Sequence, residues 1–143
     1  MAGSANSFGI LASAAYLPRW RIERRTVTDA VGWARGRVLP GQGTRSFAHW
    51  DEDSLTLAVE AGRGIHLADS PPARLLLAST SLPFADRSNA GIVREALGLP
   101  ASTQLLESGG SRRAATSALI EALEAGIPTL LCASDCFDPQ PGS

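Results

Sequence analysis

Apolar residues occur along this chain in two alternating patterns: short continuous runs, and positions spaced three or four residues apart. The continuous runs predict buried strands at residues 8–15, 74–80, 103–106 and 129–134. The wider spacing predicts helices at residues 24–34, 51–68, 86–97 and 111–125. Gly98 and Gly126 stand just after the last two helices, where glycine commonly ends a helix.

Each of the last three predicted helices carries an apolar face that should point toward a sheet. The positions expected to face inward are Leu55, Ala58, Val59, Gly62, Ile65, Ile92, Val93, Ala96, Leu97, Ala114, Ala118, Leu119, Ala122 and Leu123. Strands that alternate with helices imply crossover connections between parallel strands. The sequence therefore predicts an α/β fold of the order βαβαβαβ, a mainly parallel sheet with helices packed on it. We expect a single domain over residues 1–143.

Composition narrows the class of protein. The chain has 143 residues, of which 44% are hydrophobic, and a formal net charge of −1. This balance is typical of a globular domain and excludes a disordered chain. A net charge so near zero argues against a nucleic-acid partner, which would require a basic excess. The longest apolar stretch, at residues 8–17, is far shorter than the ~20 residues that cross a bilayer, so no membrane contact is expected.

Cysteine and lysine usage adds two expectations. Cys132 and Cys136 are too few for a disulfide framework or a four-ligand zinc site, which indicates a reduced protein of the cytoplasm. All 13 basic residues are arginine, and together with the many alanines this indicates a GC-rich bacterial genome. The absence of lysine excludes any chemistry that needs a lysine side chain.

Four segments of the chain resemble one known family. They are SFAHWDEDSLTLAVEA at 46–61, LLASTSLPFADRSNAGIVREALGL at 76–99, GGSRRAATSAL at 109–119 and ASDC at 133–136. Their order and spacing, and the opening YLPR at 16–19, are similar to the hydroxymethylglutaryl-CoA synthase branch of the thiolase superfamily. The resemblance covers nearly the whole chain and only about the first, N-terminal half of such enzymes.

The resemblance implies a fold and a mechanism. Members of the family contain two similar βαβαβαββ halves, stacked as five αβαβα layers. The first half supplies a nucleophilic cysteine where its third helix begins, and the second half supplies a histidine, often with an asparagine. In the synthase branch a glutamate that follows the second strand acts as general acid and base. By this resemblance, we expect the histidine-bearing half of the site to come from another chain.

Neither family residue of the first half is present at its expected position. The cysteine position falls on Ser111 or on Arg112, depending on the alignment, and the glutamate position falls on Ser81. Ser111 is therefore the candidate acyl acceptor, but a serine nucleophile needs an adjacent base. The alternative is that Ser111 only caps the helix, as serine commonly does.

Three arginines are candidates for binding the phosphates of a CoA ligand. Arg112 and Arg113 lie at the N-terminus of the helix predicted at 111–125, where anions are favoured, and Arg45 follows a glycine-rich loop. The alternative is that these arginines are solvated surface residues. No permanently bound cofactor is expected, and an acyl-CoA is the possible substrate.

The histidines and cysteines suggest no further chemistry. His49 and His66 have no metal-ligating neighbour in the sequence, so we expect structural or surface roles and no metal site. Cys132 and Cys136 are separated by three residues, whereas metal and redox pairs usually have two between them. We therefore expect buried free thiols, with Cys132 in the core or at an interface.

Two functions from different classes fit these observations. The chain is either a component of a thiolase-like enzyme for acyl-CoA condensation or acyl transfer, or a non-catalytic scaffold half-domain or truncated pseudoenzyme. Without the family cysteine and glutamate, we expect no condensation by this chain alone. We also expect a homo-oligomer or a complex with a second thiolase-like subunit, because the apolar strand at 129–134 would otherwise leave an open edge.

Overall fold

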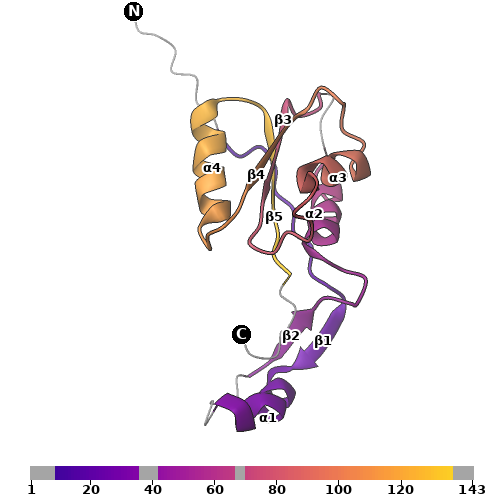
Figure 1. Ribbon diagram of the computed structural model, residues 1–143, viewed down its shortest axis with the longest axis vertical. Coiled ribbons are helices and arrows are strands. Elements are labelled where there is room, and N and C mark those ends of the chain that lie inside the picture. Colours follow the sequence, from indigo (N-terminus) through magenta and orange to yellow (C-terminus); the bar gives the residue numbers. More distant parts are fainter. Residues whose placement is uncertain (1–8, 36–41, 67–69, 137–143) are drawn as a thin grey trace, which may run out of the picture. The chain divides into compact units, whose positions relative to one another are not determined.

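Three parallel strands form the main sheet in the computed structural model, which describes residues 9–35, 42–66 and 70–136 (Figure 1). They are β3 (Arg74–Ala78), β4 (Gln104–Ser108) and β5 (Thr129–Ala133), and their order in the sheet is β4-β3-β5. Arg74 at the start of β3 is level with Gln104 on one side and Thr129 on the other. Every residue of β3 is buried, which explains its uninterrupted apolar sequence.

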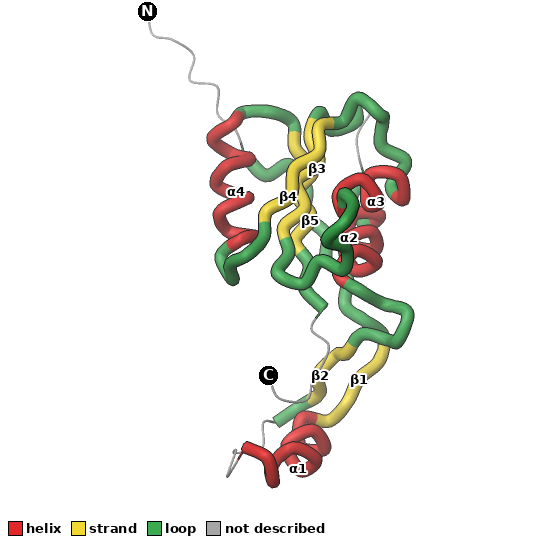
Figure 2. The backbone as a smooth tube through the Cα atoms, viewed as in Figure 1, coloured by secondary structure: helices red, strands yellow, loops and turns green. Residues whose placement is uncertain are grey.

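Helices cover both faces of this sheet (Figures 1 and 2). On one face lie α2 (Ser54–Arg63) and α3 (Asn89–Ala96), and on the other lies α4 (Ala114–Ala125). A capping box begins α2: the Asp53 carboxylate accepts from the Thr56 amide at 2.8 Å, and the Thr56 hydroxyl oxygen accepts from the Asp53 amide at 2.7 Å. Gly126 ends α4 with φ of 62°, a left-handed conformation that favours glycine.

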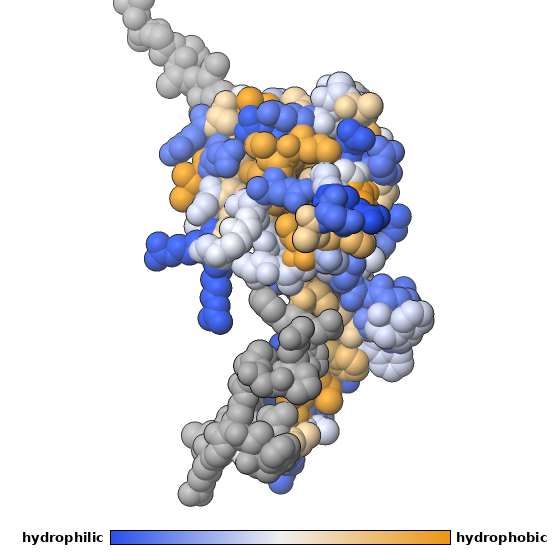
Figure 3. Space-filling model, viewed as in Figure 1, coloured by the Kyte–Doolittle hydropathy of each residue, from blue (hydrophilic) through white to orange (hydrophobic). Residues whose placement is uncertain are grey.

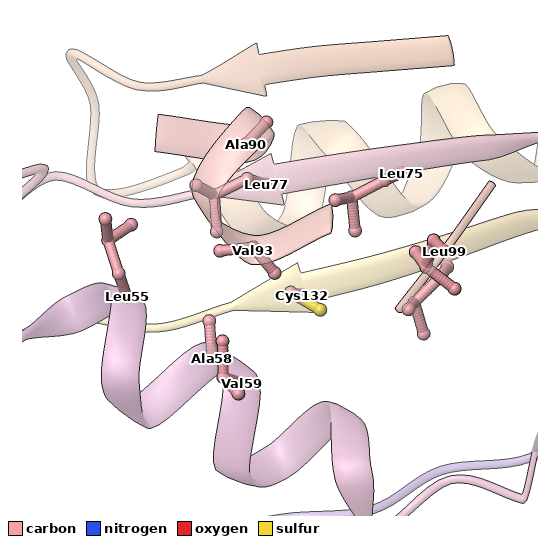
Figure 4. Packing of buried hydrophobic residues seen from close by; sticks show 10 residues of the cluster. Leu55, Ala58, Val59, Leu75, Leu77, Ala90, Val93, Leu99 and Cys132 are labelled. Carbon is pink, nitrogen blue, oxygen red and sulfur yellow. The ribbon is translucent and has the colours of Figure 1, made fainter. Parts of the chain in front are cut away.

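The hydrophobic core is thicker on the α2 and α3 side. The buried cluster there contains Leu55, Ala58, Val59, Leu75, Leu77, Ala90, Val93, Leu99, Leu130 and Cys132, and Figure 4 shows side chains of α2, α3, β3 and β5 pointing toward one another. On the α4 side only Leu76, Ala78, Ala114 and Ala118 form the buried cluster. As a result α4 leaves large apolar side chains outside, with Ile120 51% and Leu123 36% exposed.

A second compact unit, Leu17–Glu52, is distinct from the unit that contains the sheet. It consists of β1 (Trp20–Glu23), α1 (Arg24–Arg35) and β2 (Thr44–Phe47), and β1 pairs antiparallel with β2. The ring of Trp20 stacks on that of His49, with 5.7 Å between centroids. The Nδ1 of His49 lies 2.6 Å from a carboxylate oxygen of Asp51, and this hydrogen bond is the main reason why the pKa of Asp51 is lowered.

The predicted fold class is confirmed: the chain is α/β with a parallel sheet and helices packed on it. The predicted helices at 24–34, 51–68, 86–97 and 111–125 are present as α1 to α4, although α2, α3 and α4 are shorter than predicted. Residues 67 and 68 of the second prediction lie outside the described residues. The strands predicted at 74–80, 103–106 and 129–134 are β3, β4 and β5. The β1–β2 pair was not predicted, because its residues are mostly exposed and lack a clear alternation.

Two predictions about individual segments were wrong. The strand predicted at 8–15 is not formed by residues 9–15, and residue 8 lies outside the described residues. A strand needs a neighbouring backbone to bond with, and no described strand pairs with this segment, whose Leu11 is fully exposed. In α3, Ile92 and Ala96 are exposed instead of facing inward, because the inward line of this short helix is Asn89, Ala90 and Val93.

Candidate functional site

A small hollow lies where the carboxyl ends of β3 and β5 meet the start of α4. Its volume is about 160 Å³, and it is lined by Ala78, Ser79, Ser111, Arg112, Ala114, Ala115, Ala133, Ser134 and Asp135. In open α/β sheets, ligands commonly bind outside the carboxyl ends of the strands. The hollow combines small apolar side chains with hydroxyls, one guanidinium and one carboxylate.

The Asp135 carboxylate joins the ends of the two strands. Its Oδ1 accepts hydrogen bonds from the Thr80 amide at 2.6 Å, the Thr80 hydroxyl at 2.9 Å and the Ser79 hydroxyl at 3.2 Å. The Cys136 amide, in return, donates to the Ser81 hydroxyl oxygen at 2.8 Å. The turn that follows β3 is therefore bonded to the residues that follow β5.

Serine hydroxyls connect α2 to the same strand ends. The Ser54 hydroxyl at the start of α2 donates to the Ser81 carbonyl at 2.8 Å, and the Ser134 hydroxyl donates to the Ser54 carbonyl at 2.6 Å. Ser54 is almost completely buried, so these bonds are protected from water. They connect the start of α2 to the residues that follow β3 and β5.

Ser111 lies at the hollow, but its hydroxyl has a structural partner. The Ser111 hydroxyl oxygen accepts from the Arg113 amide at 3.2 Å, and its carbonyl accepts from the Ala114 amide at 2.9 Å. These bonds shape the turn that leads into α4, while Arg113 at the helix N-cap position makes no side-chain capping bond. Among the described residues, no histidine or carboxylate hydrogen-bonds the Ser111 hydroxyl. Ser111 therefore does not cap α4, whose N-cap is Arg113; its hydroxyl shapes the preceding turn and lacks the base that an activated nucleophile needs.

The structure brings together only some of the predicted binding residues. Arg112 lines the hollow beside Ser111, whereas Arg113 is not part of its lining. Arg45 lies in β2, within the Leu17–Glu52 unit. Asp135, the one carboxylate in the lining, was missed by sequence analysis; the available signal was an acidic residue directly after a predicted parallel strand.

The pKa values of Cys132 and Glu107 are also shifted, and the contacts of both side chains are structural. Burial raises the pKa of the Cys132 thiol to about 11, and this side chain belongs to the core, as predicted. Burial also acts to raise the pKa of Glu107, but hydrogen bonds from the start of α3 outweigh it, so the pKa is lowered. His66 is exposed. Within the described ranges, no three His, Cys, Asp or Glu side chains are grouped to hold a metal ion.

The curated relatives of this chain belong to one group of enzymes. No family model matches the sequence. The hydroxymethylglutaryl-CoA synthase of Aeropyrum pernix is 32% identical over 148 residues, which cover 96% of this chain and 41% of that enzyme. That of Archaeoglobus fulgidus is 34% identical over 97 residues, covering 64% of this chain and 28% of the relative. The chain thus spans well under half the length of these curated relatives.

Solved structures show the same fold. An HMG-CoA synthase complexed with CoA superposes with a TM-score of 0.72 at 22% identity, over 91% of this chain and 36% of that one. A 3-oxoacyl-(acyl-carrier-protein) synthase III gives 0.69 at 18% identity, over 87% of this chain and 40% of that one. PksG, an HMG-CoA synthase from Bacillus, gives 0.71 at 21% identity, over 89% and 35%.

The sheet order, the helices and these superpositions show a thiolase-like fold. With the curated relatives added, the chain is a thiolase-like fragment similar to hydroxymethylglutaryl-CoA synthases, and it fits their N-terminal half. No described helix has the length and apolar character needed to cross a membrane.

Proposed function

We propose that this chain is a component of an enzyme for acyl-CoA condensation or acyl transfer, and that another chain completes its site. The observation that supports this most directly is the hollow at the strand ends and the start of α4, in a chain whose curated relatives are hydroxymethylglutaryl-CoA synthases. An acyl-CoA is the proposed substrate, with no permanently bound cofactor. Localisation in the cytoplasm and a bacterial origin remain predictions. The curated relatives named above are archaeal.

The residues around the hollow support the proposal that another chain completes the site. Ser111 and Arg112 stand where the family cysteine is expected, and Ser81 stands where the synthase glutamate is expected. Both cysteines of the chain lie elsewhere, at β5 and just beyond it. The Ser111 hydroxyl accepts a backbone hydrogen bond and has no base beside it among the described residues. A complete catalytic set therefore requires groups from outside this chain.

An acyl-transfer assay tests this proposal. The purified chain is incubated with acetyl-CoA and acetoacetyl-CoA, and products and intact protein mass are followed by mass spectrometry. We expect no condensation product and no acetylated protein from the chain alone. Turnover by the pure protein that disappears in Ser111→Ala would contradict the expectation, with Ser117→Ala on the exposed side of α4 as the matched control.

Binding of CoA phosphates is proposed for Arg112, and less directly for Arg113 and Arg45. Arg112 lines the hollow at the start of α4, where the helix dipole and a guanidinium both favour an anion. Arg112→Ala should weaken CoA binding in calorimetry by roughly tenfold, the typical loss for one charged hydrogen-bonding group. Arg87→Ala, which removes an exposed arginine paired with its neighbour Asp86, should leave CoA affinity unchanged.

We further propose that the chain associates with a second copy or with another thiolase-like subunit. Within the described residues β5 pairs with β3 on one side only, so its other edge is open. Figure 3 shows hydrophobic side chains at the surface of the sheet-bearing unit, and Ile120 and Leu123 extend from α4. Exposed apolar side chains beside an open strand edge support an interaction site here.

Sedimentation at micromolar concentration tests the association. The wild type should sediment as more than a monomer, and Leu131→Arg in β5 should shift it toward monomer. Because Leu131 is half-buried, Ile120→Arg on the exposed face of α4 serves as a second variant that spares the core, with Glu124→Arg as its control. A well-folded wild-type monomer would contradict the proposal.

A non-catalytic scaffold is the second candidate function. The bond that the Ser111 hydroxyl accepts from the Arg113 amide favours it, because it gives that serine a purely structural role. Native mass spectrometry of protein purified from its source identifies any chain that co-purifies. If condensation activity appears when this partner is added, and if it requires Arg112, the chain is a component of the enzyme. If the partner has the same activity with and without this chain, the scaffold function is supported.

A further inference from the structure

One wall of the hollow depends on a single carboxylate oxygen. The turn at Ser79, Thr80 and Ser81 follows β3. The Ser79 amide still donates to the Ser108 carbonyl of β4 at 3.0 Å, and the backbone leaves the sheet after it. The Thr80 amide therefore has no strand partner and donates instead to Asp135, at 2.6 Å. The hydroxyls of Ser79 and Thr80 donate to the same oxygen. Charge-assisted bonds of this kind are stronger than those between neutral groups.

The same carboxylate gives the hollow an uneven charge. Arg112 lines it from the start of α4, and Asp135 lines it from the end of β5. No ion pair within 4.0 Å involves Asp135 among the described residues, so its negative charge is balanced only by the neutral donors of the turn. A ligand with an anionic group is attracted at the Arg112 side and repelled at the Asp135 side.

We infer that Asp135 is a positioning residue of this hollow: it holds the Thr80 turn against β5 and reserves that wall for the uncharged part of a ligand. The inference rests on the proposed function, since the ligand is an acyl-CoA whose acyl group enters the hollow. An acyl group without a charge, such as acetyl, fits beside Asp135. An acyl group that ends in a carboxylate, such as malonyl, is disfavoured there.

Hydrogen exchange of single amides tests the positioning role without any ligand. In Asp135→Ala the Thr80 amide should exchange about tenfold faster or more, which corresponds to the loss of one hydrogen bond to a charged group. Asp135→Asn keeps an acceptor and should give a smaller acceleration. The Leu77 amide in β3 serves as the reference for global opening, and Asp86→Asn, in the loop between β3 and α3, is the matched control.

The exchange result decides the positioning role in either direction. Faster exchange at Thr80 with an unchanged Leu77 amide supports it. An unchanged Thr80 amide in folded Asp135→Ala overturns it. If Asp135→Ala does not fold, the comparison is made with Asp135→Asn, in which an unchanged Thr80 amide likewise overturns the role.

Selectivity between two acyl-CoA probes tests the charge effect. The ratio of malonyl-CoA to acetyl-CoA affinity, measured by calorimetry, should rise about tenfold in Asp135→Asn, since removal of a nearby negative charge favours only the anionic acyl group. Asp86→Asn should leave the ratio unchanged. A purely structural role would lower both affinities together, so an unchanged ratio in Asp135→Asn overturns the charge effect.

The two tests separate this inference from the proposed function. If the wild-type chain binds neither probe, both the proposed acyl-CoA function and the charge selectivity are refuted. The exchange of the Thr80 amide then still decides whether Asp135 holds the turn. If both probes bind, but the Thr80 amide exchanges at the same rate in the Asp135 variants as in the wild type, the proposed function is supported and the positioning role is refuted.

Discussion

The Glu107 carboxylate links the end of β4 to the start of α3 by hydrogen bonds. Substitution of this residue should destabilise the sheet-bearing unit measurably. Its Oε1 accepts from the Ala90 amide at 2.9 Å and from the Ser88 hydroxyl at 3.0 Å, and its Oε2 accepts from the Asn89 side-chain amide at 3.3 Å. The Ala90 amide belongs to the first turn of the helix, where a negative charge is also favoured by the helix dipole.

The magnitude follows from these contacts and from the exposure of the carboxylate. A hydrogen bond to a charged group contributes about 1.5–3 kcal/mol when it is protected from water. Glu107 is exposed, and solvent screening reduces the contribution of such groups. We therefore expect Glu107→Gln, which keeps one acceptor and removes the charge, to lower the free energy of unfolding by about 1 kcal/mol at pH 7.

This contribution should depend on pH with a definite sign. The pKa of Glu107 is lower in the folded chain, because the bonds from Ala90, Asn89 and Ser88 outweigh the effect of burial. A carboxyl group with a lowered folded pKa stabilises the fold above its unfolded pKa, about 4.3 for glutamate, and this stabilisation is lost as the pH falls through the folded pKa. The difference between wild type and Glu107→Gln should therefore shrink in acid.

Urea unfolding at neutral pH and again below about pH 4 measures this difference. Glu124→Gln, at an exposed position of α4, is the control and should change stability by less than about 0.5 kcal/mol at either pH. A Glu107→Gln variant as stable as wild type at pH 7, or a deficit that grows in acid, would refute the linking role.

Three further outcomes follow from the structure. Leu77→Ala, at a fully buried position of β3, should lower the free energy of unfolding by about 2–5 kcal/mol in the same urea assay. Asp53→Ala removes the acceptor of the Thr56 amide in the capping box of α2 and should cost about 1 kcal/mol, measured by thermal unfolding. Cys132, with its pKa raised to about 11, should resist alkylation at pH 8 while Cys136 is modified, as peptide mass spectrometry would show.

Sequence pattern predicted the main sheet well because burial and periodicity coincide there. β3 lies between two strands and under helices on both faces, so its run of apolar residues could be interpreted without knowledge of its neighbours. The segment at 9–15 is equally apolar, yet its conformation depends on whether a strand lies beside it, which a local pattern does not contain. β1 and β2 were not predicted because their residues are mostly exposed and form no apolar run, although the two strands pair with each other.

The helix faces show how far periodicity alone can be trusted. In α2 the predicted positions Leu55, Ala58 and Val59 are buried, because their spacing places them on the one face that packs against the sheet. In α3 the inward line includes Asn89, a polar residue that an apolar pattern overlooks. Its side-chain amide bonds the backbone of Phe84 in both directions, at 3.1 and 2.8 Å, and these bonds offset the cost of burying it.

The candidate site shows why the resemblance located one wall and not the other. Ser111 and Arg112 could be found from a single segment, because the start of a helix is a local feature of the sequence. Asp135 and Thr80 are 55 residues apart and meet only because β5 lies directly beside β3 in the parallel sheet. Sheet order is a property of the whole fold, so the charge that opposes Arg112 across the hollow became visible only with the structure. A search for an acyl-CoA partner of this chain therefore has to consider both walls, the cationic helix start and the carboxylate at the strand end.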